Sequence, residues 1–130
     1  MLVIDANVAL FACGRDDGFE EIPDDQLAAP PLMWAEVRST LHEAKWRREI
    51  SAAAALSMLA RLERAPVRAR THPRLGRTAW RLADDLGWAK TYDAEYLALA
   101  TLLECRFVTL DARLRRGADR LGFVVSPDEL

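Results

Sequence analysis

The chain has 130 residues, of which 51% are hydrophobic and 29% charged, a balance typical of globular proteins and not of disordered ones. At this length we expect one domain spanning residues 1–130, with a core that buries roughly two-thirds of the unfolded surface. No apolar stretch is long enough to cross a bilayer, and Met1 leads into an apolar run without a basic leader. We therefore expect a cytoplasmic protein without a membrane partner.

Charge is separated along the chain, although the net charge is only −2. Residues 1–37 hold eight acids and one arginine, whereas residues 38–90 hold twelve basic and five acidic residues. Sixteen of the eighteen basic residues are arginines, whose guanidinium forks suit phosphate. The asymmetry is compatible with nucleic-acid contact. It can also belong to an ordinary solvated helix surface, and an arginine-rich composition can reflect genome base content. The domain lacks the high pI of a dedicated nucleic-acid binder.

Five short apolar segments predict strands. Residues 2–4 are large and apolar and end at Asp5, a pattern typical of a strand buried on both faces of a parallel sheet. The other expected strands are residues 27–29, 67–71, 106–110 and 122–125.

Helical patterns fill the intervals between these strands. The expected helices are residues 7–14, 31–48, 51–64, 74–86, 94–103 and 112–117. Residues 94–103 are apolar nearly all round, which indicates a helix buried on most sides. In the helix at 51–64, Ser51 is a suitable N-cap. Its expected buried side is Ala54, Met58, Leu59 and Leu62.

The segments between helices and strands complete the picture. Residues 15–26 are acidic and contain Gly18 and Pro23, which favours a loop, and Pro127 is expected to end the ordered chain. The alternation of strands and helices predicts an α/β fold. We expect a three-layer sandwich with a central parallel sheet of four or five strands, helices on both faces and right-handed crossovers.

Three aspartates occupy the ends of predicted elements. Asp5 and Asp111 each follow a buried strand, and Asp93 lies in the first turn of the most apolar helix. Each could simply cap a helix, at about 1 kcal/mol, and for Asp5 alone a cap and a ligand are equally good explanations. If the strands before Asp5 and Asp111 are neighbours at a chain reversal, both side chains project into one crevice.

Glu36 is harder to explain as a cap, because it lies inside a helix beside core positions. No base stands four residues away to pair with it, since those positions are Leu32 and Thr40. A carboxylate at a core edge is costly unless it is paired or bound to a metal, so a partner outside its own helix is expected.

Together these acids favour a metal site. Clustered carboxylates without bases require a counter-ion at neutral pH, and hard oxygen ligands select Mg²⁺, or alternatively Mn²⁺. Asn7 and Thr109 are candidates for hydrogen bonds that hold the carboxylates in place.

Four segments carry a family resemblance: LVIDANVAL (2–10), PLMWAEVRSTL (31–41), TYDAEYLALA (91–100) and RFVTLDARL (106–114). Together they resemble the PIN-domain ribonucleases, and more closely the VapC-type toxins of bacterial toxin–antitoxin pairs. The resemblance spans essentially the whole chain and implies a PIN-like sandwich. The family's acids map onto Asp5, Glu36, Asp93 and Asp111.

The resemblance implies a Mg²⁺-dependent endoribonuclease that cuts tRNA or rRNA loops with a metal-activated water. It further implies a homodimer inhibited by a cognate VapB-type antitoxin. Asp5, Asp93 and Asp111 would hold the metal, and Glu36 would orient or deprotonate the water. Some relatives carry a further acid where this chain has Arg113, so one tightly held ion is expected.

Contacts to the RNA and to partners are less defined by the sequence. Arg38 and Lys45 are the candidates for contact with the RNA backbone. Trp34 and Trp46 could belong to a dimer or antitoxin surface, or equally to the core.

Three other functions compete with this one. A catalytically silent PIN-like module that binds RNA or protein is the main alternative. A receiver domain requires paired acids after the first strand and a late lysine, which this chain lacks. A phosphatase of the haloacid dehalogenase type requires Asp-x-Asp where this chain has Asp5-Ala6-Asn7.

Overall fold

A computed structural model describes residues 1–24 and 26–130, so Asp25, an acid of the expected loop, lies outside the described part. Within these residues a five-stranded sheet has the order β3-β2-β1-β4-β5, and all its neighbouring strands are parallel. The strands are β1 (Leu2–Ile4), β2 (Leu27–Ala29), β3 (Val67–Ala69), β4 (Arg106–Val108) and β5 (Val124–Val125). The parallel sheet predicted from the apolar segments is confirmed.

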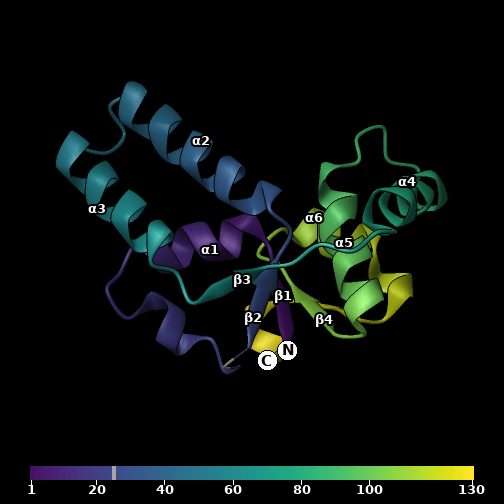
Figure 1. Cartoon of the computed structure of the whole chain (residues 1–130). Helices are drawn as coiled ribbons and strands as arrows, with labels where there is room; N and C mark the ends of the chain where they lie inside the picture. Colours follow the sequence, from purple (N-terminus) through teal and green to yellow (C-terminus); the bar gives the residue numbers. More distant parts are fainter. Residues whose placement is uncertain (25) are drawn as a thin grey trace.

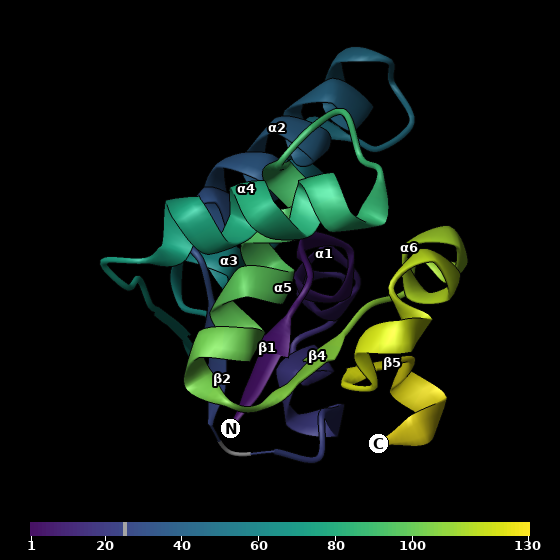
Figure 2. The ribbon, with the colours of Figure 1, turned by 90° about the vertical axis from the view of Figure 1, so that its right-hand side faces the viewer.

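Helices cover both sides of the sheet, as expected for a three-layer sandwich (Figure 1). Helices α1, α2 and α3 gather on one side of the strands, and α4 and α5 lie on the other. Figure 2 shows α5 in front of the sheet beside β1, with α4 crossing next to it. Helix α5 contacts β1 and β4, and α4 packs against α5. The helices are α1 (Ala6–Cys13), α2 (Leu32–Trp46), α3 (Ala52–Glu63), α4 (Leu75–Leu86), α5 (Tyr92–Leu103) and α6 (Ala112–Gly117). Short 3₁₀ helices are η1 (Gly18–Glu21), η2 (Asp119–Leu121) and η3 (Pro127–Glu129).

Two local predictions were wrong. Ala54 is exposed and Ala55 is buried in its place. Position 55 lies three residues before Met58 and four before Leu59, so it faces the same side as both, whereas position 54 is at helical spacing from Met58 alone. Pro127 does not end the ordered chain but begins η3. The side chains of Ser126 and Glu129 form a capping box there, and Glu129 pairs with Arg115.

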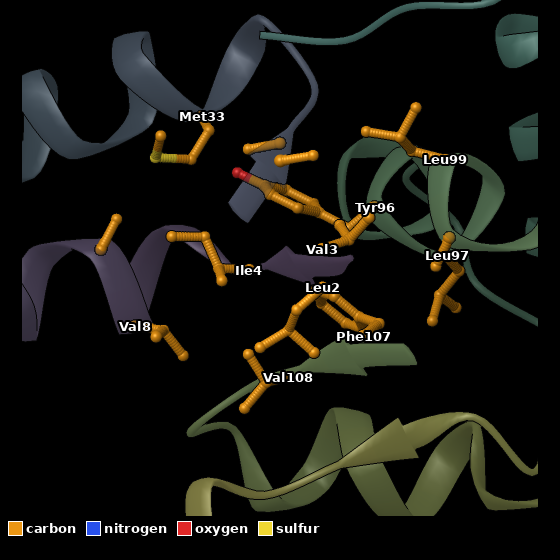
Figure 3. Packing of buried hydrophobic residues seen from close by; sticks show 14 of the residues in the cluster. Leu2, Val3, Ile4, Val8, Met33, Tyr96, Leu97, Leu99, Phe107 and Val108 are labelled. Carbon is orange, nitrogen blue, oxygen red and sulfur yellow. The ribbon is translucent and has the colours of Figure 1, made fainter. Parts of the chain in front are cut away.

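The core is built around β1 and α5. The three residues of β1 are at most 1% exposed, and residues 96–100 of α5 are completely buried. The rings of Tyr96 and Phe107 stack with centroids 5.7 Å apart. In Figure 3 the Tyr96 ring crosses the core above β1, with its hydroxyl oxygen pointing toward α2. A tyrosine hydroxyl in such a place requires a polar partner.

The sheet changes its direction of winding between β1 and β4. From β1 the chain adds β2 and β3 on one side, and β4 and β5 lie on the other. Strands β1 and β4 are hydrogen-bonded neighbours, with Ile4 opposite Val108. Their carboxyl ends therefore meet at the point where open α/β sheets form a ligand crevice.

No helix in the described part of the chain combines the length and the apolar character that a membrane crossing needs. Cys13 and Cys105 are free thiols. Burial raises the pKa of Cys13 to about 11, which makes it a poor nucleophile.

Helix α5 ends at a strained residue that offers a test of this backbone. Glu104 adopts the left-handed conformation with φ of 54°, which costs a residue with a Cβ roughly 1–2 kcal/mol. Glu104→Gly should raise the free energy of unfolding by about 0.5–1 kcal/mol, because glycine's greater freedom in the unfolded chain offsets part of the gain. Urea denaturation measures this, and Arg47→Gly, at a φ of −79°, should destabilise the protein. Equal effects of the two substitutions would contradict the assigned backbone.

Candidate metal centre

Asp5 lies directly after β1 and is only 5% exposed. Its Oδ1 accepts a hydrogen bond from the backbone N–H of Ala6 at 2.7 Å, and its Oδ2 accepts one from the Thr109 hydroxyl at 2.6 Å. Asp5 is thus the N-cap of α1. Capping uses only Oδ1, so Oδ2 is left to contact Thr109 in the segment after β4.

The pKa of Asp5 is raised to about 6, chiefly because burial removes water from the carboxylate. The hydrogen bonds from Thr109 and Ala6 lower the pKa, while the negative charges of Asp93 and Glu36 raise it. Relative to its ordinary pKa of 3.8, ionisation of Asp5 at neutral pH costs the metal-free fold about 3 kcal/mol. A cation at this position would offset that cost.

Thr109 is the centre of a hydrogen-bond network that holds Asp5. It is 1% exposed, and its hydroxyl oxygen accepts from the backbone N–H of Asp111 at 3.0 Å and from Nδ2 of Asn7 at 3.4 Å. Asn7 Oδ1 in turn accepts from the backbone N–H of Leu110 at 3.1 Å. Since two donors occupy the lone pairs of the Thr109 hydroxyl, its proton is left to point at Asp5.

Glu36 is half-buried on α2, and its partner comes from another helix. The Tyr96 hydroxyl of α5 donates to Glu36 Oε1 at 3.0 Å. Burial raises the pKa of Glu36, the Tyr96 bond lowers it, and the charges of Asp93 and Glu95 raise it. The expected partner outside the helix of Glu36 is therefore a tyrosine, which sequence reasoning did not single out. A tyrosine among the alanines and leucines of 94–100 was the available signal.

Asp93 and Asp111 line a shared cleft of about 550 Å³. Burial raises the pKa of Asp93, and the charge of Asp111 raises it further. One oxygen of Asp111 caps α6 by accepting from the backbone N–H groups of Arg113 and Leu114 at 2.9 and 3.1 Å. Asp93 does not cap α5, whose N-cap is Thr91.

The oxygen donors fit a hard divalent cation. The charges of Asp93 and Glu36 raise the pKa of Asp5, and the charge of Asp93 also raises that of Glu36. The charge of Asp111 raises the pKa of Asp93, so the four acids belong to one electrostatic cluster. In residues 1–24 and 26–130 none of the four forms a salt bridge. Glu36 Oε2, Asp111 Oδ2 and both oxygens of Asp93 also have no hydrogen-bond partner in that part of the chain. These are free, uncompensated carboxylate oxygens of the kind that Mg²⁺ and Mn²⁺ prefer.

The same geometry limits how a metal could be held. In the described residues no three His, Cys, Asp or Glu side chains stand close enough together to ligate one ion directly. A metal at this position would therefore contact some carboxylates through water. That mode suits Mg²⁺, which sheds its water reluctantly.

The basic residues expected to contact RNA do not line this cleft. Arg38 and Lys45 instead line a groove between α2 and α3. The basic residues in the cleft are Lys90 and Arg113. Glu95, two residues after Asp93 on α5, is half-buried, and its charge raises the pKa of Glu36.

Comparison with known proteins identifies the family. The family model described as PIN domain matches residues 2–120, and the chain belongs to the PIN-domain family. Its relatives include "Ribonuclease VapC9" of Mycobacterium tuberculosis and "VapC ribonuclease Mb0985" of Mycobacterium bovis. Each is 33% identical over 115 residues, or 88% of both chains. The resemblance to VapC ribonucleases noted from the sequence is confirmed.

Solved structures share the fold. "PAE2754 from Pyrobaculum aerophilum" superposes with a TM-score of 0.76 at 22% identity, covering 98% of this chain and 90% of that one. A "Toxin-antitoxin complex from Klebsiella pneumoniae" superposes with a TM-score of 0.68 at 18% identity, covering 98% of both chains. At these identities the likeness supports the α/β fold alone.

The contact between Tyr96 and Glu36 gives a prediction for the metal-free protein. Tyr96→Phe keeps the ring stacked on Phe107 but removes the donor to Glu36, so the pKa of Glu36 should rise further above its ordinary value. Carboxyl-detected NMR titration measures this, and unfolding in urea should show a loss of about 1 kcal/mol. Tyr92→Phe removes an exposed hydroxyl and should change neither quantity. An unchanged Glu36 titration in Tyr96→Phe would refute the contact.

Proposed function

We propose that this protein is a Mg²⁺-dependent endoribonuclease, contained in a single domain, and the toxin of a toxin–antitoxin pair. The observation that carries the proposal is the group of four carboxylates at the sheet's switch point, none of which forms a salt bridge within the described residues. One of them, Asp5, is buried, and its ionisation costs about 3 kcal/mol. A buried carboxylate with such a cost is typical of a functional site, where a bound cation or a reaction uses its charge. The ribonuclease names of relatives at 33% identity support RNA as the substrate.

Asp5, Asp93 and Asp111 would hold Mg²⁺, or Mn²⁺, directly or through water. When bound, such an ion lowers the pKa of a coordinated water and offsets negative charge on a phosphodiester. The chain's own part is to hold these carboxylates in position. Thr109 and Asn7 do so by joining the end of β1 to the segment after β4.

Glu36 is proposed to orient the attacking water and to accept its proton. The pKa of Glu36 is raised and so lies closer to neutral pH, and a general base is most effective when its pKa is near the working pH. The bond from Tyr96 occupies Oε1 and fixes the orientation of the carboxyl group. Oε2 is thereby left to face a water molecule.

The partners follow from the relatives. The similar structure from Klebsiella pneumoniae is a toxin–antitoxin complex, and we propose a cognate VapB-type antitoxin for this chain. We further propose a cytoplasmic homodimer that arrests growth by cutting tRNA or rRNA when it is free of the antitoxin.

Removal of one cluster carboxylate tests the activity. Asp93→Asn should lower RNA cleavage in Mg²⁺ by roughly 100-fold or more, because a charge that stabilises the reacting centre is lost. Cleavage of total RNA, followed by mapping of the new ends, measures it. Asp84→Asn, an exposed change on α4, should leave cleavage unchanged.

Two results would count against the nuclease. Full cleavage by Asp93→Asn would show that the cluster takes no part in the reaction. Binding of Mg²⁺ without any RNA cleavage by the wild-type protein would favour the catalytically silent module instead.

Proton linkage tests the metal site independently of cleavage. Because folding raises the pKa of Asp5 from 3.8 to about 6, its contribution to the stability of the metal-free protein is greatest below pH 4. That contribution is lost as the pH rises to about 6. Mg²⁺ should therefore raise the melting temperature more at pH 7.5 than at pH 5, because protons compete for the same oxygens. Scanning calorimetry measures this. An equal effect at both pH values, or an undiminished effect in Asp93→Asn, would contradict the site.

A further inference from the structure

The cleft shared by Asp93 and Asp111 also contains an aromatic and two basic residues. Its wall includes Trp88, Lys90 and Arg113, which lie on the connection from α4 to α5 and on α6. An RNA strand that reaches the carboxylates must bring its own phosphates beside several negative charges. One divalent ion offsets only two of these charges, so further cations are needed where the strand approaches the cleft.

Lys90 and Arg113 are suited to that task. Both are exposed, and neither side chain forms an ion pair or hydrogen bond anywhere in the described residues. Arg61 and Arg115, by contrast, are engaged in ion pairs with Asp16 and Glu129. The guanidinium of Arg113 can bind a phosphate with two parallel hydrogen bonds, and Lys90 adds a point charge.

Trp88 supplies a flat surface whose position is fixed. Gly87 ends α4 in the left-handed conformation, with φ of 73°, and the Trp88 N–H donates to the Ala83 carbonyl at 2.8 Å. On its other side the indole packs over Gly117 of α6, where an added Cβ would lie 3.7 Å from the ring. Trp88 is therefore half-buried between two helices and still lines the cleft. Such a ring is a stacking platform for an unpaired base.

We propose that Trp88, Lys90 and Arg113 form the binding subsite for the nucleotide next to the phosphate that is cut. Lys90 and Arg113 bind the backbone phosphate of that nucleotide, and its base stacks on Trp88. The subsite rests on the proposed ribonuclease function and specifies single-stranded RNA as the form that is bound. It also replaces Arg38 and Lys45 as the main backbone contacts.

Salt dependence of binding tests the two cations. The full-length protein is titrated with a short fluorescent single-stranded RNA in Ca²⁺ instead of Mg²⁺, and a gel confirms that the RNA stays intact. Lys90→Gln and Arg113→Gln should each reduce the slope of log K against log salt concentration by about 0.7, the value for one lost phosphate contact on a single strand. Arg64→Gln, an exposed change at the end of α3, should leave the slope unchanged. Equal slopes in all proteins, or no binding by the wild type, overturn the proposal.

Two substitutions test the stacking. Trp88→Leu should weaken binding roughly 5- to 150-fold, the range for loss of one stacked base. Trp88→Phe should keep most of the affinity but lose the quenching of indole fluorescence by RNA. Trp80→Leu, at a tryptophan that is 68% exposed on α4, is the matched control and should change neither. Melting temperatures of all variants exclude unfolding as the cause, and quenching that persists in Trp88→Phe refutes the platform.

These measurements separate the subsite from the nuclease. If RNA binding depends on the three residues but the wild-type protein cuts no RNA, the RNA-binding subsite is supported and the nuclease function is rejected. If the wild-type protein cuts RNA and the KM is unchanged in Trp88→Leu and in both cation variants, the subsite is rejected and the nuclease function is supported.

Discussion

The buried carboxylate of Asp5 constrains the rest of the site. It stands at the end of the central strand with 5% of its surface exposed, and its pKa is raised to about 6. A lone charge in that position would favour a different packing of the chain. It is tolerated because the N–H of Ala6 and the hydroxyl of Thr109 donate to its two oxygens. The Thr109 hydroxyl is held in turn by Asn7 and by the backbone of Asp111. Asn7, Thr109 and the backbone of Asp111 thus all contribute to the position of one carboxyl group.

The parallel sheet explains how acids from distant segments reach the same place. Because β1 and β4 are neighbours at the reversal of winding, the residues after them emerge side by side. Glu36 and Asp93 come from helices instead. Tyr96 lies on the same helix as Asp93, crosses the core from α5 and donates to Glu36 on α2 (Figure 3). The two helical groups on opposite sides of the sheet in Figure 1 are thus joined at the site itself.

Much of this arrangement could be predicted from the sequence. The apolar runs that end at Asp5 and Asp111 predict strands and crevice residues together, and the interior position of Glu36 predicts a partner outside its helix. Tyr96 was not predicted as that partner, because helical spacing assigns it to the core and gives no indication of where its hydroxyl points. Arg38 and Lys45 were placed from net charge along the chain, which carries no information on helix orientation. The basic residues of the cleft lie on the α4–α5 connection and on α6, whose position depends on packing that includes Trp88 against Gly117.

The hydrogen bond from Thr109 to Asp5 joins residues 104 positions apart, and this separation bears on when the site comes into existence. Strand β1 is made first but cannot complete its pairing until β4 is available. Contacts between distant segments form late in folding, because closing a long loop costs conformational entropy before the new contacts contribute any stabilising free energy. During synthesis the first 105 residues therefore lack both the strand that supports Asp5 and the threonine that holds it. The carboxylate cluster is assembled only after residues 106–111 have been made, so a chain that ends before them has Asp5, Glu36 and Asp93 but not the site.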